Sequence, residues 1–182
     1  STNDTIPTAI RLAALAKLPR LVQAVEAMAA AFERLGQQEA KTVKSGRTHL
    51  QDAVPTTLGR EFAAYAFTLR RCNAQLGATR ALLCDIGLGG SAAGTGLNTA
   101  PGYVERAAAE LARLTGEPIK PAVDLSAQMQ SMGDLQQLSN AIRALALEVT
   151  RIANDMRLLA SGPRTGFAEI TLPAVQPGSS IM

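Results

Sequence analysis

The sequence contains no tryptophan, and aromatic residues make up only 3% of its 182 residues. Few aromatic side chains and an excess of only three positive charges argue against a nucleic-acid-binding protein. No run of 18 apolar residues occurs, so no membrane span is predicted. The chain does not open with a basic segment followed by an apolar one, so we expect no signal peptide and a cytoplasmic location.

Metal-ligating side chains are also scarce, because the sequence has two cysteines and one histidine. Cys72 and Cys84 are twelve residues apart on one predicted helix, about 18 Å along its axis. That separation excludes a disulfide between them, so we predict two buried thiols in a reducing compartment. One histidine and two distant cysteines leave no zinc-type ligand set.

What the sequence does have is long helical periodicity. Alanine and leucine dominate its apolar content, which favours helix. Apolar residues recur in alternating steps of three and four within three segments, which predicts helices from Pro7 to about Leu35, from about Leu58 to Ile86 and from about Ser126 to Ala160. The first two seams run through Leu15, Leu18, Val22, Val25, Ala29 and Phe32, and through Leu58, Phe62, Tyr65, Leu69, Cys72, Leu76, Thr79, Leu83 and Ile86.

The segment 87–98 between two of these helices is rich in glycine, and its first residues match the dinucleotide-binding pattern G-x-G-x-x-A. That pattern requires a preceding strand and an immediately following helix. Here a long helix is expected before it, and the next short helix is expected only from Tyr103 to Leu114. We therefore predict that these glycines allow close backbone packing.

The predicted long helices would each be about 42 to 52 Å in length. A compact chain of this size should have a radius of gyration of only about 16 Å. We therefore expect an all-α fold, an elongated bundle of long antiparallel helices. Alanine-rich second stripes suggest that self-association completes the bundle. These stripes contain Ala13, Ala14, Ala24, Ala27, Ala31, Ala63 and Ala66.

The polar segment 44–59 connects the first two long helices and holds the only histidine, His49. Loops carried by rigid helices often hold binding and catalytic groups. Composition alone does not distinguish such a site from a polar loop with one exposed histidine. Within this loop, Arg47 and Asp52 are expected to form an ion pair.

Several segments resemble motifs of the fumarase/aspartase superfamily. Residues 1–9 (STNDTIPTA) resemble its S-[ST]-N-D-x-x-P-T segment, and residues 46–53 (GRTHLQDA) resemble its G-R-T-H-L-Q-D-A segment. Residues 178–182 (GSSIM) resemble the opening of its G-S-S-x-M-P-x-K-x-N loop. Further similarities lie at 94–98, 152–155 and 161–164. The resemblance covers essentially the whole chain in family order.

The resemblance implies a central helical-bundle domain over 1–182, a segment of a longer subunit without its flanking parts. Family subunits are more than twice this length. The resemblance also implies a homo-oligomer, expected to be a tetramer, whose active sites are shared between subunits.

The resemblance assigns site roles residue by residue. Ser179 and His49 are expected to be catalytic, with Ser179 as the general base. The substrate-binding residues expected from the motifs are Ser1, Thr2, Asn3, Thr48 and Ser180. Loss of a proton next to a carboxylate builds up negative charge, which hydrogen-bond donors of this kind can stabilise. The chemistry requires no metal or organic cofactor, so none is expected.

Two reactions and one non-catalytic role remain open. Thr2 in the opening motif is more similar to aspartate ammonia-lyases than to fumarases, which favours elimination of ammonia from L-aspartate to give fumarate. Fumarate hydratase is the alternative reaction. A purely structural helical oligomer would explain the helical seams but not the polar motifs. In that case Ser1, Thr2 and Asn3 would only cap the first helix.

Overall fold

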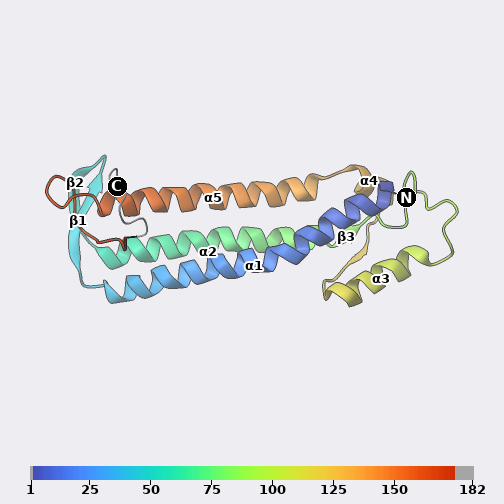
Figure 1. Ribbon diagram of the computed structural model, residues 1–182, viewed down its shortest axis with the longest axis horizontal. Coiled ribbons are helices and arrows are strands. Elements are labelled where there is room, and N and C mark those ends of the chain that lie inside the picture. Colours follow the sequence, from blue (N-terminus) through green and yellow to red (C-terminus); the bar gives the residue numbers. More distant parts are fainter. Residues whose placement is uncertain (1, 175–182) are drawn as a thin grey trace. The chain divides into compact units, whose positions relative to one another are not determined.

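The computed structural model describes residues 2–174 and confirms a mainly helical protein (Figure 1). The chain divides into two compact units, Ser1–Leu145 and Ala146–Met182. The elements are, in order, α1 (Thr2–Gln38), β1 (Val43–Thr48), β2 (Gln51–Thr57), α2 (Leu58–Leu82), β3 (Asp85–Ile86), α3 (Tyr103–Thr115), β4 (Lys120–Pro121), α4 (Leu125–Gln130) and α5 (Gly133–Leu159). Among the described helices, none is long and apolar enough to cross a membrane.

The core of the first unit is the antiparallel pair α1 and α2. The predicted seams face the interior, and Leu15, Ala29, Leu69 and Leu76 are at most 2% exposed. Three aromatic side chains add to this core with ring centroids 5.5 to 6.4 Å apart: Phe32, Phe62 and Tyr65. The predicted 3–4 periodicity is therefore confirmed as the packing face of both helices.

Two glycines let α1 and α2 approach closely where the chain reverses direction. A β-carbon on Gly59 would overlap the carbonyl oxygen of Gly36, and one on Gly36 would lie 3.1 Å from the carbonyl oxygen of Gly59. Thr57 then caps α2, because its side chain accepts a hydrogen bond from the N–H of Arg60 at 3.2 Å. These contacts fix the base of the segment that connects the two helices.

That connecting segment was expected to be a loop, and this expectation was wrong. Strands β1 and β2 form an antiparallel hairpin in which Thr48 pairs with Gln51. Thr and Val residues in both strands suit extended backbone, and the short segment lacks a helical period. The polar motif that contains His49 is therefore held on a hydrogen-bonded ribbon.

The second long helix ends earlier than its seam predicted. Helix α2 stops at Leu82, and Leu83 and Ile86 stay buried although they lie beyond it. Ile86 belongs to β3, which pairs in parallel with β4. Cys84 therefore lies outside the helix that contains Cys72, and both cysteines are free and buried as predicted.

The third long helix is also interrupted, so the prediction of one helix from Ser126 to Ala160 was wrong. Asp124 caps α4 by accepting from the N–H of Ala127 at 3.0 Å. Ser131 then adopts an extended conformation, with φ −89° and ψ 135°, and α5 begins two residues later. The apolar spacing continues through the break, which explains why periodicity alone did not reveal it.

The second unit contains the remainder of α5 and the residues that follow it. On α5, Arg151 forms ion pairs with Glu148 and Asp155 at 2.9 and 3.1 Å. After the helix the chain folds back, and the N–H of Glu169 donates to the carbonyl of Leu159 at 2.9 Å. This return holds the chain against the end of its own helix.

Candidate active site

The amino-terminal end of α1 holds the first predicted motif. Thr2 and Asn3 lie in the first turn and are exposed, while the next residue, Asp4, is only 5% exposed. The side-chain amide of Asn3 donates to the carbonyl of Ala92 at 2.7 Å. The turn is thereby attached to a loop almost 90 residues further along the chain.

Asp4 fixes this loop more firmly. Its carboxylate accepts backbone N–H groups from Gly89 and Ser91, each at 3.1 Å. Burial of the carboxylate acts to raise its pKa, the hydrogen bonds from Gly89 and Ser91 act to lower it, and the resulting pKa lies below its ordinary value of 3.8. Asp4 is therefore ionised at neutral pH and acts as an anchor for the glycine-rich segment.

The glycine-rich segment 87–98 packs closely, as the sequence predicted. A β-carbon on Gly94, whose φ is +88°, would overlap Ser126 of α4, and the hydroxyl of Ser126 donates to the carbonyl of Ala93 at 2.8 Å. Gly89, with φ +95°, leaves no space for a β-carbon beside Val104 of α3. The two-residue strand β3, rather than a long helix, directly precedes the segment. The next helix after β3 is α3, which begins only at Tyr103. This arrangement differs from a dinucleotide-binding turn.

These elements line an open cleft of about 600 Å³. One wall is the first two turns of α1, the other is α4, and the loop at Ala92 and Ala93 lies between them. The lining residues are Thr2, Asn3, Ile6, Pro7, Ala92, Ala93, Ser126, Met129 and Gln130. Their polar groups are hydroxyls and amides without formal charge. Within residues 2–174, no group of three or more histidine, cysteine or acidic side chains could hold a metal ion.

The second predicted motif lies at the tip of the β1–β2 hairpin. His49 and Leu50 form its two-residue loop with φ values of +49° and +62°. Positive φ at both central residues is the pattern of a type I′ turn, which matches the twist of the strands but is unusual for leucine. Thr48 and His49 are both exposed, and Leu50 is 62% exposed. The tip therefore presents its side chains outwards.

The body of the hairpin is anchored more firmly than its tip. The ammonium of Lys44 forms an ion pair with Glu61 of α2 at 2.8 Å, and the Lys44 side chain is only 7% exposed. The hydroxyl of Ser45 donates to the Asp52 carboxylate at 2.9 Å. Arg47 and Asp52 are register partners across the strands, so the ion pair expected between them remains a prediction.

The two motifs do not meet within one chain. Thr2 begins α1, and the hairpin follows the other end of this 37-residue helix (Figure 1). At about 1.5 Å per residue, α1 separates them by about 55 Å. Ser1, Ser179 and Ser180 lie outside the described residues.

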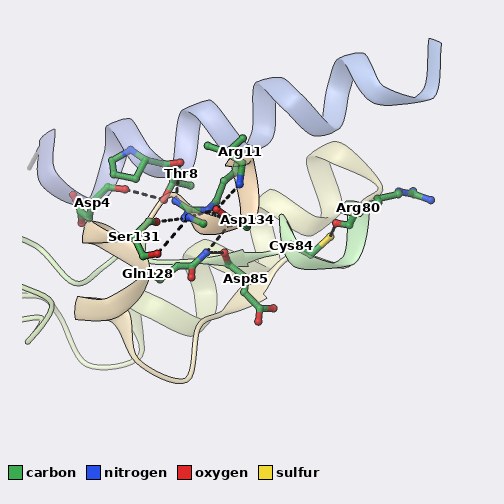
Figure 2. A network of polar contacts seen from close by, with 12 residues as sticks. Asp4, Thr8, Arg11, Arg80, Cys84, Asp85, Gln128, Ser131 and Asp134 are labelled. Atoms are coloured by element: carbon green, nitrogen blue, oxygen red, sulfur yellow. Dashed lines mark hydrogen bonds and ion pairs between the residues drawn. The ribbon is translucent and has the colours of Figure 1, made fainter. Parts of the chain in front are cut away.

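Sequence reasoning missed a buried polar network between α1 and the start of α5 (Figure 2). Thr8 and Arg11 are buried on α1, and Arg11 forms an ion pair with Asp134 at 2.6 Å. Gln128 of α4 donates to the same carboxylate at 3.2 Å. The available signal was spacing, since the steps of three and four continue backwards from Leu15 through Arg11, Thr8 and Asp4. A search for apolar residues alone could not detect it.

A family model described as Lyase matches residues 1–182. The chain is 47% identical to an aspartate ammonia-lyase of Pseudomonas aeruginosa and 45% identical to a class II fumarate hydratase of Ralstonia nicotianae, in each case over its full length. A solved structure of a fumarate lyase:delta crystallin from Brucella melitensis bound to cobalt matches all of the chain with a TM-score of 0.95 and 47% identity. The chain covers 39%, 40% and 40% of these three proteins, respectively.

Proposed function

The chain belongs to the lyase family whose model matches residues 1–182, and on this premise we propose that the protein containing it eliminates ammonia from L-aspartate to give fumarate. The observation that carries the proposal is the cleft at the start of α1. It combines exposed hydroxyl and amide groups with the first turn of a 37-residue helix. A helix amino terminus favours negative charge, so this cleft suits a carboxylate group of the substrate.

In the proposed reaction, Thr2 and Asn3 bind a substrate carboxylate next to the carbon that loses its proton. Negative charge grows on that carboxylate as the proton leaves, so donors fixed in advance lower the barrier. The Asp4 anchor supports this role, because it fixes the turn that carries Thr2 and Asn3 before substrate arrives. Ser1 and Ser180 are proposed as further binding groups.

Ser179 is the proposed general base, and it accepts the proton from the carbon. A serine hydroxyl has a high pKa, so it requires surrounding donors or positive charge in order to act as an alkoxide. His49 is proposed as the second catalytic group and Thr48 as a substrate-binding donor. Exposure of both residues at the hairpin tip supports contact with a group outside their own chain.

The proposed site is shared between subunits of a homo-oligomer, which we propose to be a tetramer. The separation of about 55 Å between Thr2 and the hairpin supports this arrangement, since one chain cannot bring them to one substrate. Several alanines of the expected second stripe are exposed in the single chain: Ala13, Ala24, Ala27 and Ala63. These small side chains offer a face against which helices of other copies could pack closely.

Fumarate hydration is the alternative reaction, supported by the 45% identity to a class II fumarate hydratase. Both reactions remove a proton next to a carboxylate and differ in the group that leaves. The opening motif has Thr2 rather than a serine, which resembles aspartate ammonia-lyases more than fumarases and favours aspartate. A non-catalytic helical oligomer remains the second alternative.

An ultraviolet assay for fumarate, run separately with L-aspartate and L-malate, tests the proposal on the full-length protein. Fumarate formation from aspartate is expected. Formation from malate alone would assign fumarase activity, and no formation from either would reject both reactions. Ser179→Ala should lower kcat far more than it raises KM, because the base acts on the transition state. Ser139→Ala, at an exposed position of α5, is the matched control and should leave kcat unchanged.

A further inference from the structure

We infer that Arg11 and Asp134 form a positioning pair that fixes the separation between the two walls of the cleft. Neither residue lines the cleft, and neither belongs to a motif predicted to bind substrate. Their effect on turnover rests on the proposed function, whereas their effect on the cleft does not. The two effects can therefore be measured separately.

Arg11 occupies an unusual position for a cation. Its side chain is 1% exposed, and it lies on the face of α1 that packs into the interior between Thr8 and Leu15. An apolar residue at this position would continue the hydrophobic seam at no desolvation cost. A buried arginine requires partners for its guanidinium N–H groups, and here they come from α1 itself and from the connection between α4 and α5.

The guanidinium joins α1 to the connection between α4 and α5. Its Nε and Nη2 donate to the two carboxylate oxygens of Asp134 at 2.6 and 3.1 Å, a bidentate arrangement. Nη2 also donates to the carbonyl of Ser131 at 2.7 Å, and Nη1 donates to the carbonyl of Pro7 at 3.2 Å. One side chain therefore holds both the first turns of α1 and the break that ends α4.

Asp134 extends this connection to α4 itself. One of its oxygens also accepts from the side-chain amide of Gln128 at 3.2 Å, and the other accepts from the N–H of Leu135 at 2.8 Å. The Gln128 amide donates in addition to the carbonyl of Asp85 in β3 at 2.7 Å. Figure 2 shows these side chains converging between α1 and α4. The carboxylate thus links α4 to α1 and to the start of α5, and Gln128 links α4 to β3.

The contacts coincide with both walls of the cleft. Pro7, which accepts from Arg11, lines the α1 wall, and Gln128 lies between Ser126 and Met129, which line the α4 wall. Helix α4 has only six residues and is too short to be stable without such contacts. If the pair is broken, α4 should move or fray, and the cleft that contains Thr2 should lose its defined width.

The planar guanidinium is essential to this role. Arginine offers several donors in a rigid fork, whereas the single ammonium of lysine cannot reach both Asp134 oxygens and the Ser131 carbonyl in the same geometry. Arg11→Lys therefore keeps the charge and removes the geometry, while Arg11→Met removes both. If only the charge of Arg11 matters, Arg11→Lys should keep the function that Arg11→Met loses. If Arg11 has a positioning role, Arg11→Lys should keep stability better than it keeps activity.

The kinetic test compares wild type with Arg11→Lys and Asp134→Asn in the full-length protein, using L-aspartate as substrate. Arg70→Lys is the matched control, because Arg70 is also bidentate to an acidic residue, Glu33, on exposed helical surface. Misplaced binding groups should lower kcat/KM by about 10- to 100-fold and raise KM. A smaller folded fraction alone would lower kcat and leave KM unchanged.

Amide hydrogen exchange tests the same inference without turnover. Exchange across α4 should accelerate in Arg11→Lys, while exchange in the α1–α2 core around Leu69 and Leu76 should stay at the wild-type rate. Arg70→Lys should leave α4 unchanged. Wild-type exchange in α4, or an unchanged KM in Arg11→Lys, would overturn the positioning role. If wild type converts neither aspartate nor malate, the proposed function fails, and the exchange rates alone decide the role of the pair.

Discussion

The first turn of α1 and the tip of the β1–β2 hairpin hold the two described motifs of the proposed site. The two regions differ in burial and in the contacts that hold them. Next to Thr2 and Asn3, Asp4 is buried and anchors a distant loop through two backbone hydrogen bonds. At the hairpin, Thr48 and His49 extend outwards from a two-residue turn. One motif is therefore organised by contacts inside its own chain, whereas the side chains of the other are exposed.

The largest expected effect tests whether these regions act in one site from different copies. Asn3→Ala and His49→Ala should each lower kcat by roughly 100-fold or more, because each removes a group that interacts with the reacting substrate in the proposed reaction. Mixed oligomers of the two variants should regain activity, since some sites then receive both intact groups. Steady-state assays of co-refolded variants measure this recovery.

Mixed oligomers of His49→Ala and Thr48→Ala are the control, because both changes lie on one hairpin and no site regains an intact tip. Recovery is not expected there. If Asn3→Ala and His49→Ala form mixed oligomers that stay as inactive as the parent variants, the two motifs do not come from different copies.

The second prediction concerns the space around Gly94, in the glycine-rich segment that Asp4 anchors. Gly94→Ala would force a β-carbon into Ser126 at a φ of +88°, so we expect a loss of about 3 kcal/mol in the free energy of unfolding. Gly116→Ala is the control, because Gly116 has φ +70° and no atom within 4 Å of the added carbon. Only backbone strain of about 1 to 2 kcal/mol should appear there. Urea unfolding measures the free energy of unfolding of both variants. Equal losses in the two would contradict close packing at Gly94.

Helices and their packing faces could be predicted from the sequence, but the connections between them could not. Leu69 and Leu76 are buried where the periodicity predicted. The hairpin and the break at Ser131 depend on local hydrogen bonds that periodicity does not report. The buried Arg11–Asp134 pair joins positions 123 residues apart, and only the fold brings them together. Recognition of motifs identified Thr2, Asn3 and His49 as candidates, and the long helix predicted between them already indicated their separation within one chain.

The third prediction uses the lowered pKa of Asp4. Because the folded-state pKa lies below the unfolded value, ionised Asp4 stabilises the fold fully above the ordinary value of 3.8, and this contribution is lost as the pH falls through the folded-state pKa. Asp4→Asn should therefore cost about 2 kcal/mol at neutral pH, and the difference from wild type should shrink in acid. Urea unfolding from neutral pH to below 3.8 measures it. A difference that grows in acid would contradict the anchor.

The smallest expected effect lies at the hairpin. Leu50→Gly should relieve the strain of a leucine at φ +62° and raise the free energy of unfolding by about 1 kcal/mol or less. Leu50→Ala keeps a β-carbon, so it should bring no such gain. Thermal unfolding distinguishes the two variants, and a marked loss of stability in Leu50→Gly would show that the exposed side chain has a packing role.

The buried polar start of the α1 seam has a consequence for biosynthesis. Asp4 and Arg11 find their partners 85 to 123 residues later in the sequence. A ribosome adds about 5 to 20 residues per second, so Asp134 is synthesised on the order of 6 to 25 seconds after Arg11. The apolar part of α1 packs against α2, which is nearby in the sequence, so the α1–α2 pair can form before the Arg11–Asp134 pair. The cleft is therefore completed after the helices that support it.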